Sequence, residues 1–178
     1  MFRSKKLKAE NQFGVEQAWK IHQAQAEWTG RVDAKASFAF TIESAAIATT
    51  VALSDGDRLF SNRSGNLVEV MYWGGLFALL AGAFFAVAVV MPRLRSDVAR
   101  KAAKNNFIYF GHVRHWDSVE LAAALQDSDI LAVLTRQIVV MGDIAWKKHR
   151  WVQISMVCGA IGGSLIGICG IVLSFVNQ

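Results

Sequence analysis

Proline and cysteine are both scarce in this 178-residue chain, which contains one proline and two cysteines. Pro92 is the single residue whose missing amide hydrogen would interrupt a helix, so long uninterrupted helices are expected on either side of it. Cys158 and Cys169 lie in one apolar segment about three helical turns apart, which is too far for a disulfide within a helix. The sequence therefore indicates a helical fold in which both cysteines are small packing residues.

Sequence motifs of common enzyme classes are absent as well. The chain has no Gly-x-x-x-x-Gly-Lys loop, no Gly-x-Ser-x-Gly and no His-Glu-x-x-His. His112 and His115 could share a helix face, but no third metal ligand follows at a suitable spacing. We therefore predict no catalytic residue, no metal and no cofactor, with an active site hidden between His112 and Asp117 kept as the alternative.

Charged residues are few, at 19% of the chain against 53% apolar residues. A soluble domain of this length is usually more polar, so the composition indicates an integral membrane protein. The formal net charge of +5 could suggest nucleic-acid binding. In a membrane protein it is explained more simply by the excess of Lys and Arg on the cytoplasmic side.

Three apolar segments are expected to cross the membrane as helices, at residues 36–53, 68–91 and 152–176. The first is the shortest and contains Glu43, so a buried helix of a soluble domain remains its alternative. One helix is expected from about Gln12 to Leu53. The fold class that follows is all-α: a polytopic membrane protein with three transmembrane helices, two of which extend into long cytoplasmic helices.

The distribution of Lys and Arg predicts the orientation of these spans. Residues 1–35 hold seven of them, residues 54–67 hold two and residues 92–151 hold ten. Positive charge is retained on the cytoplasmic side of a bacterial inner membrane. We therefore expect a cytoplasmic N-terminus, a periplasmic loop at residues 54–67, a cytoplasmic helical sensor region at residues 92–151 and a periplasmic C-terminus.

The sensor region has its own local signals. The basic run from Arg93 to Lys104 is typical of a contact with lipid headgroups. Asp117 or Ser118 is expected to cap a short helix, and the segment 127–129 is expected to cap a helix that continues into the third span.

Small residues recur every fourth position at the start of the third span, at Ser155, Gly159, Gly163 and Gly167. In lipid, helices associate largely through close backbone approach at such positions. The ladder therefore predicts helix packing, either against the second span of the same chain or between two protomers.

Basic side chains near the cytoplasmic ends of the spans are candidates for binding phosphate. For the Trp146–Trp151 segment an interfacial collar is the favoured interpretation, and an anion site for phosphate is the alternative. The candidate nucleotide-binding residues are Arg31, Lys35, His112, Arg114, Arg136, Lys147, Lys148 and Arg150. The candidate pore or gating residues are Asp33, Glu43 and Thr50.

Two stretches carry a family resemblance. The first is Trp28 to Ser37, with Asp33-Ala-Lys-Ala at the mouth of the first span. The second comprises Phe110-Gly-His, Gln137-Ile and Ile144-Ala-Trp-Lys-Lys before the last span. Together they resemble the transmembrane effector family of bacterial Pycsar antiphage defence, which is related to SLATT effectors and to the membrane proteins of Hailong systems.

The resemblance implies a nucleotide signal, made by a cognate cyclase or nucleotidyltransferase, that acts on the cytoplasmic helices so that the membrane part impairs the inner membrane and aborts infection. We accordingly predict a homo-oligomeric ion channel or pore controlled by a cyclic mononucleotide or a short oligonucleotide, with four subunits as the expected ring. The alternative is a non-conducting, membrane-anchored scaffold whose cytoplasmic helices bind a partner protein.

Overall fold

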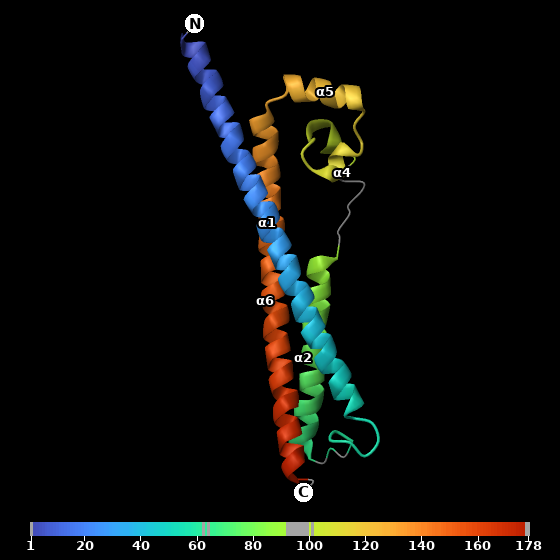
Figure 1. Cartoon of the computed structure of the whole chain (residues 1–178). Coiled ribbons are helices and arrows are strands. Elements are labelled where there is room, and N and C mark those ends of the chain that lie inside the picture. Colours follow the sequence, from blue (N-terminus) through green and yellow to red (C-terminus); the bar gives the residue numbers. More distant parts are fainter. Residues whose placement is uncertain (1, 62, 64, 92–99, 101, 177–178) are drawn as a thin grey trace. The chain divides into compact units, whose positions relative to one another are not determined.

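The computed structural model describes residues 2–61, 63, 65–91, 100 and 102–176. Its elements are five α-helices and one short 3-10 helix (Figure 1): α1 (Phe2–Ala52), α2 (Asn66–Val90), η1 (Ala103–Asn105), α4 (Phe110–Val113), α5 (Ser118–Asp127) and α6 (Ile130–Val176). No strand occurs in these described ranges. The predicted all-α fold is therefore confirmed.

The two long helices form because their sequences offer nothing that ends a helix. Neither α1 nor α6 contains proline, and each runs from polar residues into an apolar segment without a break. The expected helix from Gln12 to Leu53 is confirmed at its C-terminal end, but the backbone is helical from Phe2, so the helix begins earlier than expected. The segment expected as the second span, residues 68–91, is helical in α2, which ends at Val90.

The chain divides into two compact units, which are described separately. Unit 1 comprises Met1–Gly30 and Pro92–Trp146, and unit 2 comprises Arg31–Met91 and Lys147–Gln178. Pro92 and the basic residues Arg93 and Arg95, which were expected to close the second span and contact headgroups, lie outside the described residues.

Unit 1 combines the start of α1 with the helices that precede the last span. Gly14 of α1 lies close to Leu131 of α6, so that a Cβ atom there would be 3.2 Å from the leucine side chain. Trp116 closes the loop before α5, because its indole Nε1 donates to the carbonyl oxygens of Ala103 at 2.8 Å and Asn106 at 3.2 Å.

The predicted helix starts in unit 1 are confirmed. The Asp117 carboxylate accepts a hydrogen bond from the Val119 amide at 2.8 Å at the start of α5. The Asp129 carboxylate accepts from the Leu131 amide at 3.1 Å at the start of α6. These caps determine where the two helices begin.

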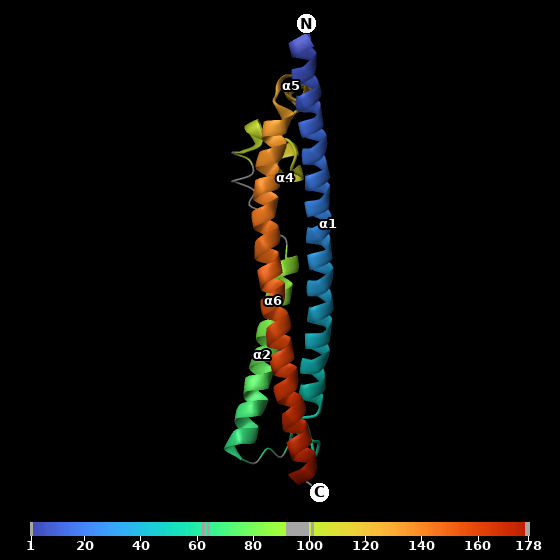
Figure 2. The same cartoon turned by 90° about the vertical axis from the view of Figure 1, so that its left-hand side faces the viewer.

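Unit 2 is built from the second half of α1, all of α2 and the second half of α6. Figures 1 and 2 both show α2 beside the second half of α6. One cluster of buried residues, which includes Val32, Ala36 and Val152, lies where α1 and α6 enter the unit. A second cluster joins Tyr72 to Cys169 at the opposite end, so the packing role expected for this cysteine is confirmed.

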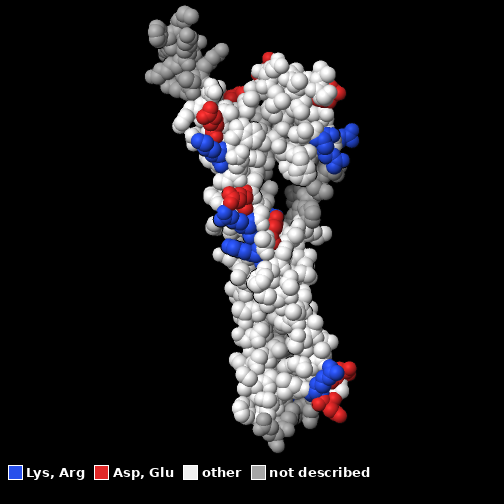
Figure 3. Space-filling model, viewed as in Figure 1, with Lys and Arg blue, Asp and Glu red and all other residues white. Residues whose placement is uncertain are grey.

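Among the described residues, two helices are long and apolar enough to cross a membrane, α2 and α6, each with a mean hydropathy of 2.2 over its best window. Only 33% and 17% of the residues in these windows are buried, whereas the core helix of a soluble protein is mostly buried. On the face seen in Figure 3, no charged side chain is visible between the two charged ends of unit 2. The first predicted span, residues 36–53, is not among the helices that meet this criterion and stays a prediction.

Candidate functional site

A buried carboxylate at the junction of three helices is the most distinctive feature of unit 2. Glu43 of α1 is 3% exposed, and the Ser155 hydroxyl of α6 donates to its Oε1 at 3.2 Å and more weakly to Oε2 at 3.5 Å. Glu43 is the single charged residue of the sequence between Lys35 and Asp55. The three helices therefore enclose the one ionisable group of this apolar stretch.

Two glycines make room for this carboxylate. A Cβ atom at Gly82 of α2 would lie 2.5 Å from Glu43 Oε1, and one at Gly159 of α6 would lie 2.6 Å from the same oxygen. Real Cβ atoms essentially never approach a heavy atom that closely. Glu43 therefore fits between α2 and α6 because both positions lack a side chain.

A second polar contact joins α1 to α6 where they enter unit 2. The Lys148 ammonium donates to both oxygens of the Asp33 carboxylate, at 2.6 and 2.8 Å. Both side chains are partly exposed, so this ion pair contributes little to stability and can be exchanged for water or another ion at small cost. The structure therefore pairs a residue expected to bind a phosphate with a residue expected to act in gating.

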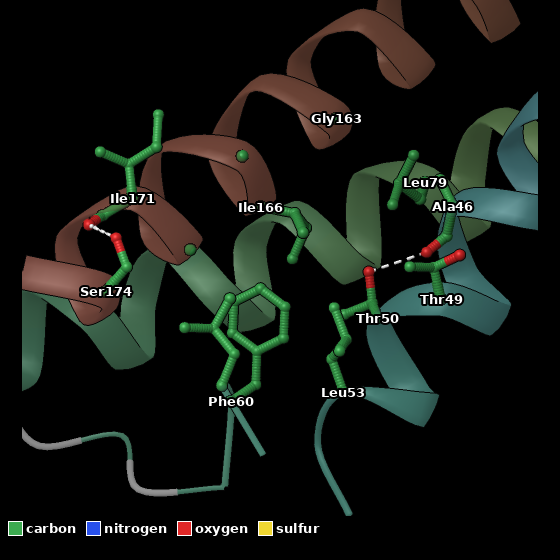
Figure 4. A pocket seen from close by; sticks show the side chains of 13 residues that line it. Ala46, Thr49, Thr50, Leu53, Phe60, Leu79, Gly163, Ile166, Ile171 and Ser174 are labelled. Atoms are coloured by element: carbon green, nitrogen blue, oxygen red, sulfur yellow. Dashed lines mark hydrogen bonds between the residues drawn. The ribbon is translucent and has the colours of Figure 1, made fainter. Parts of the chain in front are cut away.

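Thr50, the third candidate gating residue, lies deeper along α1. It is 2% exposed, and its hydroxyl donates to the Ala46 carbonyl of its own helix at 2.8 Å. It also lines an open groove of about 530 Å³ in unit 2 (Figure 4). The Thr50 hydroxyl thus has its hydrogen-bond partner within α1, and the residue forms part of the wall of the groove.

The basic candidates of unit 1 are His112, Arg114 and Arg136. The Arg136 guanidinium donates to the Asn106 side-chain oxygen at 3.5 Å. His112 Nδ1 has no hydrogen-bond partner, and its ring packs edge-on against Tyr109 with centroids 5.3 Å apart. Burial lowers the pKa of His112, and the neighbouring His115 lowers it further. Both effects favour the neutral form of His112.

The other five basic candidates, Arg31, Lys35, Lys147, Lys148 and Arg150, belong to unit 2. All except Lys148 are exposed. The predicted set thus divides between the two units, and within unit 2 Lys148 forms an ion pair with Asp33.

The predicted ladder of small residues on α6 divides into two halves. Ser155 and Gly159 both contact Glu43, so this half packs within the chain. Gly163 and Gly167 have no atom within 4 Å of a Cβ built on them, and both line the groove. The first half thus packs against Glu43 of α1, whereas the spacing of the ladder suggested the second span or another protomer as its partner.

Three glycines that shape this junction were not predicted from the sequence. The close approach of Gly82 to Glu43 is the first of these contacts. Gly75 and Gly162 mark a close backbone approach between α2 and α6, because a Cβ at Gly162 would lie 2.7 Å from the Gly75 carbonyl oxygen. The seven-residue spacing of Gly75 and Gly82 could have indicated one helix face turned toward a partner.

Comparison with known protein families identifies one match, and it covers nearly the whole chain. A family model described as the Pycsar effector protein domain matches residues 17–176. The chain belongs to this family. The resemblance inferred from the sequence is therefore confirmed, and the chain is a Pycsar effector that acts in antiphage defence at the membrane.

No curated protein and no solved structure matches the chain. The region matched in this Pycsar effector includes the contacts of Asp33 with Lys148 and of Glu43 with Ser155, each of which joins α1 to α6. In the described part of the chain, no group of three or more His, Cys, Asp or Glu residues could hold a metal ion.

Proposed function

We propose that this Pycsar effector assembles into an oligomeric channel or pore whose opening is controlled by a nucleotide second messenger on the cytoplasmic side. It acts without enzymatic chemistry, and its activation impairs the inner membrane. The observation that carries the proposal is the enclosure of Glu43 by Ser155, Gly82 and Gly159.

An acidic residue in the middle of a membrane helix is energetically costly, so such residues are rare and usually have a function. A charged residue at mid-bilayer costs about 3 kcal/mol on insertion scales, and such residues commonly line ion paths or coupling sites. A helix bundle that only anchors a protein in the membrane needs neither this acid nor the two glycines that accommodate it. In the proposal, Glu43 is enclosed in the closed channel and becomes accessible to water and cations when the helices separate.

The first span belongs to the proposal because Glu43 lies on it. Residues 36–53 form about 27 Å of helix at 1.5 Å per residue, which is close to the thickness of a bilayer core. The N-terminus and residues 92–151 are then cytoplasmic, and the C-terminus is periplasmic, as the distribution of Lys and Arg indicates.

Signal transmission follows from two contacts between the same pair of helices. Asp33 and Glu43 are ten residues apart on α1, or about 15 Å along the helix. Each contacts α6, through Lys148 and Ser155 respectively. An anionic phosphate competes with the Asp33 carboxylate for Lys148, and the released α1 rotates or tilts relative to α6. The same movement withdraws Glu43 from Ser155.

Purified protein in liposomes tests the proposal, with ion leakage recorded before and after addition of cyclic mononucleotides or short oligonucleotides. We expect leakage in the presence of one nucleotide class and a changed leakage rate for Glu43→Gln, which keeps the shape of the side chain but loses its charge. Asp57→Asn is the matched control, because Asp57 is an exposed acid of the loop in the same unit. A nucleotide that binds without leakage, while a partner protein is recruited, supports the scaffold instead.

A further inference from the structure

A short stretch of unit 1, residues 102–116, closes on itself around two aromatic rings, and we call it the α4 segment. The Asn106 side chain donates to the Ala102 carbonyl at 2.8 Å. The Trp116 ring packs edge-on against the buried Phe107, with ring centroids 6.1 Å apart. These contacts, together with the two hydrogen bonds of the Trp116 indole, hold the surface of the segment in place.

A second pair of aromatic rings lies at the surface of the α4 segment. Phe110 is 67% exposed, and its ring centroid lies 4.4 Å from that of Tyr109. The Tyr109 ring also contacts His112 edge-on and lies over Gly111, where an added Cβ atom would overlap it. Tyr109 is therefore fixed by its neighbours, and it supports a phenylalanine ring that faces water.

The charge around these rings has one sign. No acidic residue occurs in the sequence between Asp97 and Asp117, and the Asp117 carboxylate caps α5. Arg136 of α6 is brought to the segment by its contact with Asn106. Together with it, the exposed basic residues are Arg100, Lys104 and Arg114. Figure 3 shows basic side chains gathered on this part of unit 1, which therefore attracts anions.

Exposed aromatic and basic side chains together fit either a nucleotide or a membrane surface, and two observations favour the nucleotide. Among the described residues from 100 to 118, Phe110 is the single large apolar side chain that is exposed, whereas a segment that lies on a membrane inserts a whole apolar face. Tryptophan is enriched at headgroup depth, yet Trp116 is turned inward to backbone carbonyls. A nucleobase, in contrast, needs one ring to stack on and basic groups for its phosphate.

We propose that the α4 segment binds the nucleotide that controls this effector, with the base stacked on Phe110 and the phosphate facing Lys104, Arg114 and Arg136. The inference rests on the nucleotide control of the proposed function and locates the base of the ligand in unit 1. Every base has a face that can stack on an aromatic ring. The stacked ring therefore supplies affinity and does not by itself distinguish one base from another.

Equilibrium dialysis of the full chain in detergent tests the site, with 3′,5′-cyclic mononucleotides and single-stranded trinucleotides as probes. Phe110→Leu keeps an apolar side chain but removes the ring. Since stacking on an aromatic ring contributes about 5- to 150-fold to affinity, we expect a loss in this range. Phe110→Trp should retain the affinity. Phe13→Leu is the matched control, because Phe13 is 64% exposed on α1 of the same unit, and it should bind as the wild type does.

A second pair of measurements separates the base from the phosphate. Lys104→Gln should lower the affinity for the nucleotide and make it less dependent on salt concentration, whereas Lys20→Gln, at an exposed lysine of α1 in the same unit, should change neither. Ribose 5-phosphate has the phosphate without the base, so it should bind more weakly than the nucleotide and equally well to the wild type and Phe110→Leu. If Phe110→Leu weakens both probes to the same extent, the ring does not stack on the base and the inference is wrong.

Labelling with a water-soluble maleimide tests the membrane as the alternative partner of this surface. Asn105→Cys places a thiol at an exposed position of the segment, Cys158 is replaced by alanine, and the buried Cys169 is retained. In nanodiscs we expect the labelling rate to be the same in neutral and anionic lipid and to fall when the nucleotide is added. A rate that falls in anionic lipid without nucleotide assigns the surface to the membrane and overturns the inference.

Leakage from liposomes, measured on the same variants, separates this site from the proposed function. Nucleotide-dependent leakage that is unaffected by Phe110→Leu and Lys104→Gln overturns the site and leaves the channel standing. Binding that depends on both residues but causes no leakage keeps the site and rejects the channel. If the wild type binds none of the nucleotide probes, the site and the nucleotide control of the channel are both wrong.

Discussion

Replacing Gly82 by alanine should open the channel in the absence of a nucleotide. The new Cβ would lie 2.5 Å from Glu43 Oε1, 2.9 Å from its carboxyl carbon and 3.1 Å from the Ser155 carbonyl oxygen. Ordinary contacts of a Cβ atom begin at 3.4 Å. The carboxylate must therefore move by about 0.9 Å, and its hydrogen bond with Ser155, already 3.2 Å long, is expected to break.

The size of the effect follows from the cost of overpacking. Adding a methyl group to a filled site costs about 1–3 kcal/mol, and here that cost applies to the enclosed arrangement alone. A difference of this size changes the ratio of two conformations by about 5- to 150-fold. We expect basal leakage to rise by a factor in this range, and nucleotide addition to increase leakage less than in the wild type.

Ion flux from liposomes in the absence of nucleotide is the assay. Gly74→Ala is the matched control, because Gly74 lies on the same helix and its Cβ would have a single neighbour at 3.9 Å. A Gly82→Ala variant whose basal and stimulated flux both equal those of Gly74→Ala would refute the idea that the enclosure of Glu43 holds the channel shut.

Two further predictions concern the water-side groups. Asp33→Asn should raise basal leakage while lowering the free energy of unfolding by at most about 1 kcal/mol, since the ion pair with Lys148 is partly exposed. Exchanging the two residues, Asp33→Lys with Lys148→Asp, should restore low leakage. If leakage stays high in this double variant, the ion pair does not couple the two helices. The lowered pKa of His112 means that the unfolded chain binds more protons than the folded one, so stability should fall as pH decreases through the ordinary value of 6.5 toward the lower folded pKa. His112→Gln should reduce the dependence of stability on pH, measured by thermal unfolding between pH 7.5 and 5. An unchanged pH dependence would show that other groups cause it.

The helices themselves were largely predictable from the sequence. Their ends depend on local chemistry, such as the carboxylates of Asp117 and Asp129 and the turn-rich loop after α1. The position of α2 follows from an apolar run of the length that a bilayer requires. Local signals of this kind act over one or two helical turns and are visible in a single sequence.

The arrangement around Glu43 was not predictable in the same way. That this acid should avoid lipid follows from its charge, but its partners Gly82 and Ser155 are 39 and 112 residues away in the sequence. Which helix face meets which neighbour depends on the rotation of all three helices. The pairing of Lys148 with Asp33 has the same origin, and spacing alone suggested that Lys148 would bind a phosphate.

The ladder on α6 shows how one pattern can serve two purposes. Its four members have equal spacing and similar size, so the sequence predicts one continuous contact. In the structure, Ser155 and Gly159 enclose Glu43, whereas Gly163 and Gly167 line an open groove. The difference arises because α1 fills the first half of the ladder and leaves the second half open.

Current recording across a planar bilayer tests the central claim most directly. Purified protein is added to one side, and cyclic mononucleotides and short oligonucleotides are supplied in turn to the side facing the N-terminus. We predict discrete current steps that depend on one of these nucleotides and whose ion selectivity changes in Glu43→Gln. A nucleotide that binds the protein while the bilayer stays non-conducting would contradict the account.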